Sequence, residues 1–208
     1  MGKRAGKNNV RFFWPFSFRK TRFTEVFIRE NALDDRGFEK WIFCPGMLFN
    51  AQEKWWGDQG ERDTPHVGLD LCIYRARQDK IFRLNEKTKI PVMYGGVVVR
   101  IINDFLGKTV IMEHSLPNSD KSRLYVFYGH TKPYGDFQVG RAFKEGDTIA
   151  TLADLKKSKA NIFPHLHISV GWTSQAVSYD KLNWETIGAT NMLTLLDPLH
   201  FIDWPYAL

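Results

Sequence analysis

Two histidines stand one residue apart in the stretch NIFPHLHISV, at positions 165 and 167. Because side chains alternate between the two faces of a strand, His165, His167 and Ser169 are predicted to share one face, and the apolar residues between them can enter a core. Neighbouring positions on one face lie about 6 to 7 Å apart, so one imidazole can bind a metal ion while the other acts beside it. A pair of hydrogen-bonded or surface histidines is the alternative.

A second pair of possible ligands lies in TPHVGLDL, where His66 and Asp70 are four residues apart. A regular strand would separate them by roughly 13 Å, which is too far for one ion. Gly68 lies midway and can adopt the unusual backbone angles of a bend, which would let the two side chains converge. Imidazole and carboxylate are both zinc ligands, and His167 is the natural third ligand from a distant strand. A chance occurrence is the alternative, because His-x-x-x-Asp is a common pattern.

Other residues near these motifs allow more than one interpretation. His130 stands at the predicted end of a strand, where a histidine can face a cleft or simply occupy a turn. His114 and His200 are expected to have packing or solvent roles. Trp55 and Trp56 precede the first predicted ligand and can form either a substrate wall or part of the packing.

The chain consists mostly of short strand-like segments separated by Gly, Pro, Asn and Asp turns, which predicts a mainly β domain with antiparallel sheets, few short helices and long surface loops. We expect a meander of strands, followed by two short strands punctuated by Gly140 and Gly146. We also expect a long surface loop and an apolar C-terminal segment that packs back onto the domain. These are residues 90–102, 108–114 and 123–130 for the meander, 139–152 for the short strands, 172–191 for the loop and 195–208 for the end.

Composition limits the possibilities without selecting one. At 208 residues and 43% hydrophobic content, the chain can bury a substantial core as one large domain. A net charge of +6 favours acidic surroundings such as nucleic acid, anionic lipid or a cell-wall polymer.

Cys44 and Cys72 give no disulfide framework, and two buried thiols are expected, with their pairing left open. No signal peptide is recognisable at the start, and no apolar run approaches a membrane span.

In their order along the chain, His-x-x-x-Asp, Tyr-x-His and His-x-His resemble the lysostaphin/LytM-type zinc metallopeptidases. These are peptidoglycan endopeptidases that cut peptide stems or cross-bridges of the bacterial cell wall. The resemblance runs from about Arg62 to Asp197. It includes the segments HVGLDL, IPVMYGGVVVRI, YGHTK, VGRAFKEGDTIA and PHLHISV, which occur in the family's order.

The resemblance implies a role for each of five positions. His66, Asp70 and His167 become the ligands of one Zn²⁺ ion per chain, and His130 and His165 become catalytic histidines that do not bind the metal. The expected metal site lies in a groove formed by the antiparallel sheets.

The resemblance also implies a domain division and a setting for the protein. Residues 56–208 become a zinc metallopeptidase domain, and residues 1–55 a basic, aromatic N-terminal lead of uncertain structure. A peptidoglycan peptide is the expected substrate, nucleic acid is not expected as a partner, and an extracytoplasmic location is expected.

Two readings from other classes of protein stay open at this point. One is a non-catalytic cell-wall-binding or regulatory module on the same fold, which the unsubstituted set of five positions argues against. The other is a carrier domain of the biotinyl or lipoyl kind, because VGRAFKEGDTIATL resembles a Gly-punctuated strand pair. A carrier domain needs a modifiable lysine at an exposed hairpin tip and leaves the histidine motifs unexplained. The oligomeric state is not predicted.

Overall fold

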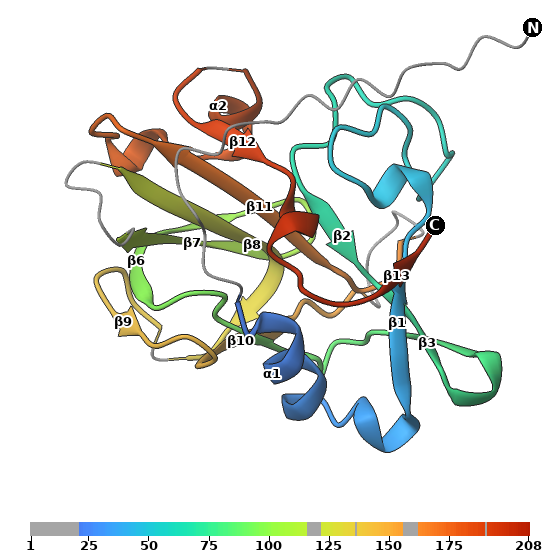
Figure 1. Ribbon diagram of the computed structural model, residues 1–208. Helices are drawn as coiled ribbons and strands as arrows, with labels where there is room; N and C mark the ends of the chain where they lie inside the picture. Colours follow the sequence, from blue (N-terminus) through green and yellow to red (C-terminus); the bar gives the residue numbers. More distant parts are fainter. Residues whose placement is uncertain (1–20, 116–121, 136, 156–161, 190) are drawn as a thin grey trace, which may run out of the picture.

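The computed structural model describes residues 21–115, 122–135, 137–155, 162–189 and 191–208. In these residues the chain forms mainly antiparallel strands and two short α-helices, which confirms the predicted fold class (Figure 1). The helices are α1 (Phe23–Glu30) and α2 (Trp184–Ala189). The strands are β1 (Phe38–Ile42), β2 (Leu69–Leu71), β3 (Ile73–Ala76), β4 (Lys80–Arg83), β5 (Lys89–Pro91), β6 (Gly96–Asn103), β7 (Lys108–Ser115), β8 (Arg123–Pro133), β9 (Ala142–Phe143), β10 (Thr148–Leu152), β11 (Leu166–Thr173), β12 (Thr194–Leu196) and β13 (Tyr206–Ala207).

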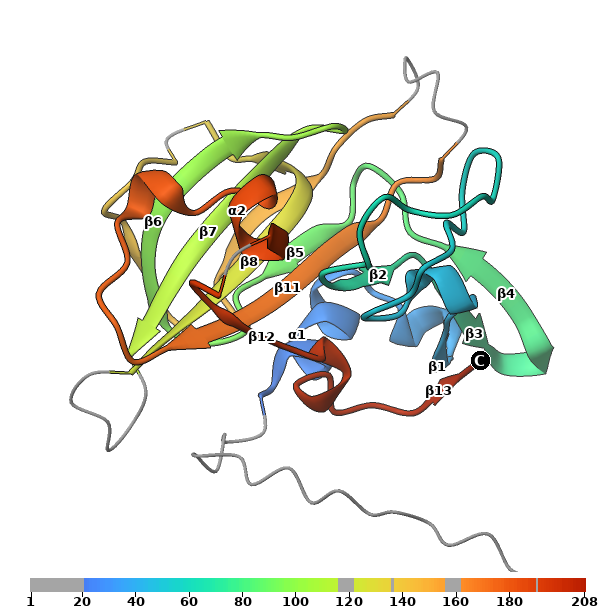
Figure 2. The ribbon, with the colours of Figure 1, turned by 90° about the horizontal axis from the view of Figure 1, so that it is seen from above.

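The larger sheet has the strand order β12-β11-β8-β7-β6-β9, and neighbouring strands in it are antiparallel. β2 pairs with β11, and β10 pairs with both β5 and β8. β6, β7 and β8 follow one another along the chain and lie side by side, which confirms the predicted meander (Figure 2). The two short strands predicted around Gly146 are present as β9 and β10.

The main core lies against one face of β11. Leu166, Ile168 and Val170 alternate along this strand, are completely buried and belong to the same cluster as Leu69 and Leu71 of β2. Burial of a Leu, Ile or Val side chain stabilises a fold by about 1.5–3 kcal/mol. Because a slip of one residue would turn all three to the opposite face, the core fixes the register that directs His167, and His165 just before the strand, away from this cluster.

Residues 21–55 contribute side chains to this core. Phe27 of α1, Trp41 of β1 and Met47 are fully buried in the cluster that also contains β2. β1 lies in the smaller sheet, which has the order β13-β1-β3-β4. The segment predicted as an N-terminal lead therefore contributes a helix, a strand and core side chains from residue 21 onward, whereas residues 1–20 lie outside the described residues.

The C-terminal segment packs back onto the domain, as predicted. Phe201 and Ile202 are buried, and β13 runs parallel to β1 with Tyr206 paired to Trp41. None of the helices in the described parts of the chain combines the length and the apolar character needed to cross a membrane.

The expectation of a surface loop over residues 172–191 is wrong for much of this segment. β11 continues to Thr173, and the segment then forms a short 3-10 turn and α2. Leu182 and Ile187 are buried in a second cluster with Phe127 of β8. A six-residue helix is too short to show a helical period in the sequence, which explains why only a loop is predicted there.

The two cysteines differ in environment. Cys72 is buried and Cys44 is exposed, so the expectation of two buried thiols is wrong for Cys44; both are free thiols. Burial raises the pKa of the Cys72 thiol to about 12, which keeps it protonated and unreactive at neutral pH.

Candidate metal centre

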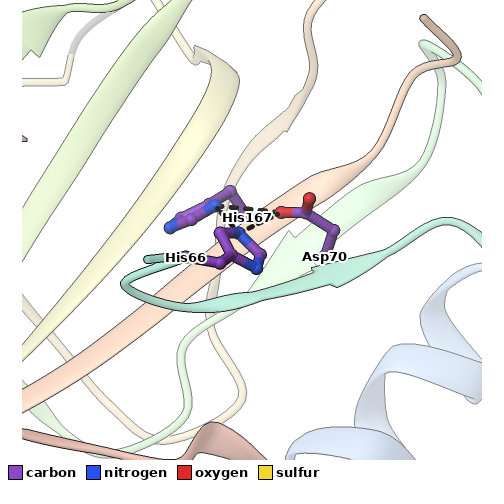
Figure 3. Close-up of side chains that lie close together, drawn as sticks. All are labelled: His66, Asp70 and His167. Carbon is purple, nitrogen blue, oxygen red and sulfur yellow. Dashed lines mark hydrogen bonds and ion pairs between the residues drawn. The ribbon is translucent and has the colours of Figure 1, made fainter. Parts of the chain in front are cut away.

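Asp70 and His167 lie directly opposite each other on two paired strands. β2 runs antiparallel to β11, and the register pairs Asp70 with His167. Side chains at directly opposite positions point to the same face, with Cβ atoms about 4.5–5.5 Å apart. The two groups meet here, with 2.9 Å between Oδ1 of Asp70 and Nδ1 of His167 (Figure 3).

His66 joins this pair from the loop that leads into β2. Its Nε2 lies 3.1 Å from Nδ1 of His167 and 3.3 Å from Oδ1 of Asp70. The predicted role of Gly68 is corrected, because its φ is not positive. A Cβ atom at Gly68 would instead overlap with the carbonyl oxygen of Ile168 and the imidazole of His167. Glycine is required here because the loop crosses closely over β11.

These three groups fit a zinc ion. With bonds of about 2.0–2.2 Å, tetrahedral zinc holds its ligand atoms roughly 3.3–3.6 Å apart. The three atom pairs among His66, Asp70 and His167 are 3.1, 3.3 and 2.9 Å apart, so shifts of a few tenths of an ångström suffice. Two imidazoles and one carboxylate are a common zinc-binding set, and these residues are a group that can hold a metal ion.

Hydrogen bonds on the far side of each imidazole determine which nitrogen faces the other ligands. Nδ1 of His66 lies 2.8 Å from the carbonyl oxygen of Leu48, so it donates its proton there and leaves the Nε2 lone pair available. Nε2 of His167 lies 2.9 Å from Oγ of Ser169, which leaves Nδ1 to face Asp70. Outer hydrogen bonds of this kind fix the tautomer and orientation of metal ligands.

Trp55 holds the carboxylate. Its indole Nε1 donates to Oδ2 of Asp70 at 2.7 Å, and its ring packs edge-on against His165 with 5.1 Å between the ring centroids. Burial opposes ionisation of Asp70, but the facing groups of His66, His165 and His167 keep the pKa of this carboxyl well below its usual value. Asp70 is therefore an anion, as metal binding requires.

His165 lies beside the predicted ligands, and only its Nδ1 contacts a backbone group. Its Nδ1 is 2.8 Å from the carbonyl oxygen of Phe163, and its Nε2 is 3.9 Å from Oδ1 of Asp70. Burial lowers the pKa of His165 to about 3 even though Asp70 raises it. The imidazole is therefore neutral at pH 7, with its proton on Nδ1 and a lone pair on Nε2.

His130 reaches the same place through a β-bulge. β8 places Gly129 opposite His167, so regular alternation would direct Gly129 and Thr131 toward the site and His130 away from it. The register between β7 and β8 shifts by one residue at this point, and His130 adopts a left-handed φ of 60°. Its ring then lies 4.7 Å from the ring of His165 and 5.8 Å from that of His167, measured between centroids.

Asp104 supports this bulge. Its Oδ2 accepts hydrogen bonds from the backbone N–H of His130 at 2.8 Å and from Oγ1 of Thr109 at 2.7 Å. Its Oδ1 lies 3.2 Å from Nδ1 of His130 and also accepts from the backbone N–H groups of Leu106 and Gly107. Burial opposes ionisation of Asp104, but the hydrogen bonds, foremost those with His130, keep its pKa far below the usual value.

A cavity of about 380 Å³ opens over these side chains. Its walls include Trp56 and Phe105, whose ring centroids are 5.9 Å apart, and Trp184 of α2. Trp184 packs edge-on against His167 at 4.8 Å and donates its Nε1–H to Oγ1 of Thr109. All five residues predicted for the site line this cavity, namely His66, Asp70, His130, His165 and His167.

The two remaining histidines lie elsewhere, in agreement with their predicted roles. His114 is 1% exposed, and its Nδ1 lies 2.9 Å from the carbonyl oxygen of Gly95. His200 is exposed, and its Nδ1 lies 3.1 Å from the carbonyl oxygen of Asp197.

Three side chains around the site are not identified by the sequence motifs as supporting groups, namely Trp55, Asp104 and Trp184. Asp104 had one usable signal, because it stands at the start of a turn between two predicted strands and three residues before Gly107. The sequence predicts only a wall or packing role for Trp55, because its position in the predicted lead gives no sign of its contact with Asp70.

Neither a scan against protein-family models nor a search of curated proteins finds a match for this chain. The solved structures that are similar to it include the following three. The solution structure of lysostaphin is 20% identical, with a TM-score of 0.41, and the match covers 69% of this chain and 45% of that one. A putative peptidase M23 from Pseudomonas aeruginosa is 19% identical, with a TM-score of 0.37 and coverage of 76% and 59%.

The third structure is the catalytic domain of a mutant of the prophage-encoded M23 protein EnpA from Enterococcus faecalis. It is 19% identical, with a TM-score of 0.36, and the match covers 70% of this chain and 98% of that one. This chain therefore spans less than two thirds of the first two structures. The second and third of these structures are M23 proteins.

Proposed function

We propose that this protein is a zinc-dependent metalloendopeptidase that hydrolyses peptide bonds in the stems or cross-links of bacterial peptidoglycan. The observation that carries the proposal is the convergence of His66, Asp70 and His167 in one cavity with two further histidines, His130 and His165. Three ligand groups beside two imidazoles are the components that metal-assisted peptide hydrolysis requires.

In this proposal His66, Asp70 and His167 hold the zinc ion, which when bound polarises a peptide carbonyl and lowers the pKa of water. His165 is neutral and offers Nε2 as a proton acceptor, because its Nδ1–H is directed to the carbonyl of Phe163. An imidazole that has taken up a proton can donate it to the leaving amine. His130 adjoins His165 and is the second imidazole beside the proposed ligands that can take up a proton and pass it on.

The order of the motifs along the chain supports peptidoglycan peptide as the substrate, through the family resemblance given above. Because peptidoglycan lies outside the cytoplasmic membrane, the proposal places the protein in the periplasm, in the cell wall or outside the cell. Zinc as the resident metal is supported by the ligand types, since imidazole nitrogen and carboxylate oxygen are common zinc ligands.

Digestion of purified peptidoglycan tests the proposal. The zinc-loaded protein is incubated with purified peptidoglycan, and the released muropeptides are identified by mass spectrometry. New peptide termini within stems or cross-links are expected, and they should be absent with a His167→Ala protein. Binding to the wall without any release of muropeptides would identify a non-catalytic wall-binding module instead.

A further inference from the structure

The left-handed conformation of His130 requires a stabilising partner. A non-glycine residue at φ of 60° costs on the order of 1 kcal/mol, and a β-bulge also removes a backbone N–H from the ladder between strands. In this chain that N–H donates to Oδ2 of Asp104 at 2.8 Å. The bulge is therefore compensated by a buried carboxylate, whose side chain is 1% exposed.

The same carboxylate contacts the imidazole of His130. Its Oδ1 lies 3.2 Å from Nδ1 of His130, so the ionised Asp104 favours the tautomer that carries its proton on Nδ1. Nε2 is then the nitrogen left for chemistry in the cavity that both residues line. A carboxylate in this relation to a histidine fixes the tautomer and the orientation of the ring.

Asp104 is itself held rigidly. Three donors other than His130 bind it, namely the backbone N–H groups of Leu106 and Gly107 and the hydroxyl of Thr109, all at 2.7–2.8 Å. These bonds tie the carboxylate to the turn between β6 and β7 and to the start of β7. The turn and the bulge of the neighbouring strand are therefore joined through one side chain.

We propose that Asp104 is the positioning residue of His130, which it holds in the bulge with Nε2 directed to the site. This inference rests on the proposed function, because it gives His130 its task. Asp104 is not a catalytic residue, since it acts on the reaction through His130.

Nitrogen-15 NMR of the histidine side chains tests the contact independently of activity. The His130 signals are assigned by comparison with a His130→Ala protein. The wild-type protein is expected to carry the neutral His130 proton on Nδ1, and an Asp104→Asn protein is expected to lose this preference. A wild-type His130 protonated on Nε2 would overturn the proposal whether or not the Asp104 variant folds.

A double-mutant cycle tests the consequence for turnover. Asp104→Asn is expected to lower kcat on the order of 10²-fold, with little change in KM and full zinc content. In a His130→Ala background the same change should have no further effect, because its target is gone. An equal loss of turnover in both backgrounds would mean that Asp104 has a purely structural role and would overturn the proposal.

Asp147→Asn is the matched control, because Asp147 also accepts a backbone N–H in a turn, from Lys144, but lies outside the cavity. It should leave kcat and the His130 tautomer unchanged. If the zinc-loaded wild-type protein shows no hydrolysis at all, the proposed function fails, and the NMR measurement still decides whether Asp104 positions His130.

Discussion

The indole N–H of Trp55 donates a 2.7 Å hydrogen bond to Oδ2 of Asp70, while Oδ1 of the same carboxylate faces His66 and His167. The two oxygens of Asp70 are therefore distinguished before any metal binds. Oδ2 accepts a hydrogen bond from the neutral indole, and Oδ1 faces the two imidazoles of the proposed metal site. Trp55 thus determines which oxygen is presented to an ion.

Replacement of Trp55 by Phe should weaken zinc binding. The aromatic packing against His165 is kept, but Oδ2 of Asp70 loses its donor, and loss of such an outer hydrogen bond typically lowers metal affinity by about 10- to 100-fold. Competition with a chromophoric chelator measures the change. Trp56→Phe is the matched control, because Trp56 lines the cavity next to Phe105 and should leave the zinc affinity unchanged. Equal affinities for wild type and Trp55→Phe would contradict the role given to Trp55.

The two histidines of the His-x-His strand should respond differently to replacement. His167→Ala removes one of three proposed ligands, so the protein should lose most of its zinc and its activity. His165→Ala leaves the ligands intact, so zinc should be retained while turnover falls on the order of 10²- to 10⁴-fold, the usual contribution of a positioned acid or base. His130→Ala should behave like His165→Ala. Zinc content and hydrolysis are measured on the same preparations, with circular dichroism to confirm folding.

Reversed behaviour would reverse the assignment. If His165→Ala lost its metal and His167→Ala retained it, His165 would be the ligand. Retention of metal and full activity by both proteins would place the site elsewhere.

Removal of zinc should lower thermal stability. A ligand that binds only the folded protein stabilises it by about 4 kcal/mol when its free concentration is 1,000 times its Kd. Addition of a chelator should therefore lower the unfolding midpoint of the wild-type protein. The His167→Ala protein, with its ligand set incomplete, should show no such response. An unchanged midpoint for the zinc-loaded wild-type protein would argue against a resident metal.

Gly68→Ala tests the close crossing of the loop over β11. The added methyl group would overlap with the carbonyl oxygen of Ile168 and with the imidazole of His167, so the loop that carries His66 must move. Overpacking of this kind typically costs about 1–3 kcal/mol of unfolding free energy. Zinc affinity should fall with it. Gly135→Ala is the control, because a Cβ atom at Gly135 meets nothing within 4 Å and should change neither quantity.

His114 should contribute a pH dependence to stability. Burial lowers its pKa from the usual 6.5 to about 4 in the folded protein, although Gly95 and Glu113 act in the opposite direction. Well above pH 6.5, the His114 side chain is neutral in both the folded and the unfolded protein. As the pH falls from 6.5 to 4, the unfolded chain takes up a proton that the folded protein does not, so stability is lost in this window.

Replacement of His114 by Asn measures this contribution. Asn removes the titration and can still donate to the carbonyl of Gly95. The loss of unfolding free energy between pH 7 and pH 5, from denaturant titrations, should be smaller by about 2 kcal/mol in His114→Asn. The exposed His200→Asn should match the wild type. An identical pH dependence in His114→Asn and wild type would contradict the assignment.

Much of the architecture follows from local patterns in the sequence. The apolar alternation on both sides of His167 predicts a strand with one buried face, and the structure buries that face completely. The glycine punctuation predicts β9 and β10. Segment 172–191 could not be predicted in the same way, because its buried residues Leu182 and Ile187 belong to a short turn and a one-to-two-turn helix held by tertiary packing.

The sequence motifs likewise predict five residues that line one cavity in the structure. They do not predict which neighbouring groups hold these five side chains in place. Regular alternation would turn His130 away from the site, and only the bulge supported by Asp104, 26 residues earlier, turns it back. The sequence predicts that Gly68 is needed, but for a different reason, because lack of space and not a positive φ excludes a side chain there. Such contacts depend on neighbours that are remote in sequence.

The 3.1 Å approach of His66 to His167 bridges 101 positions of the chain. Closing a loop of that length costs entropy that only the assembled core repays, so contacts of this kind form late in folding. During synthesis, a nascent chain that already contains His66 and Asp70 lacks the proposed third ligand, His167, for about a hundred more residues. If zinc binds as proposed, its complete ligand set therefore assembles only after His167 has joined the core, so the metal is expected to stabilise the folded domain rather than to start its folding.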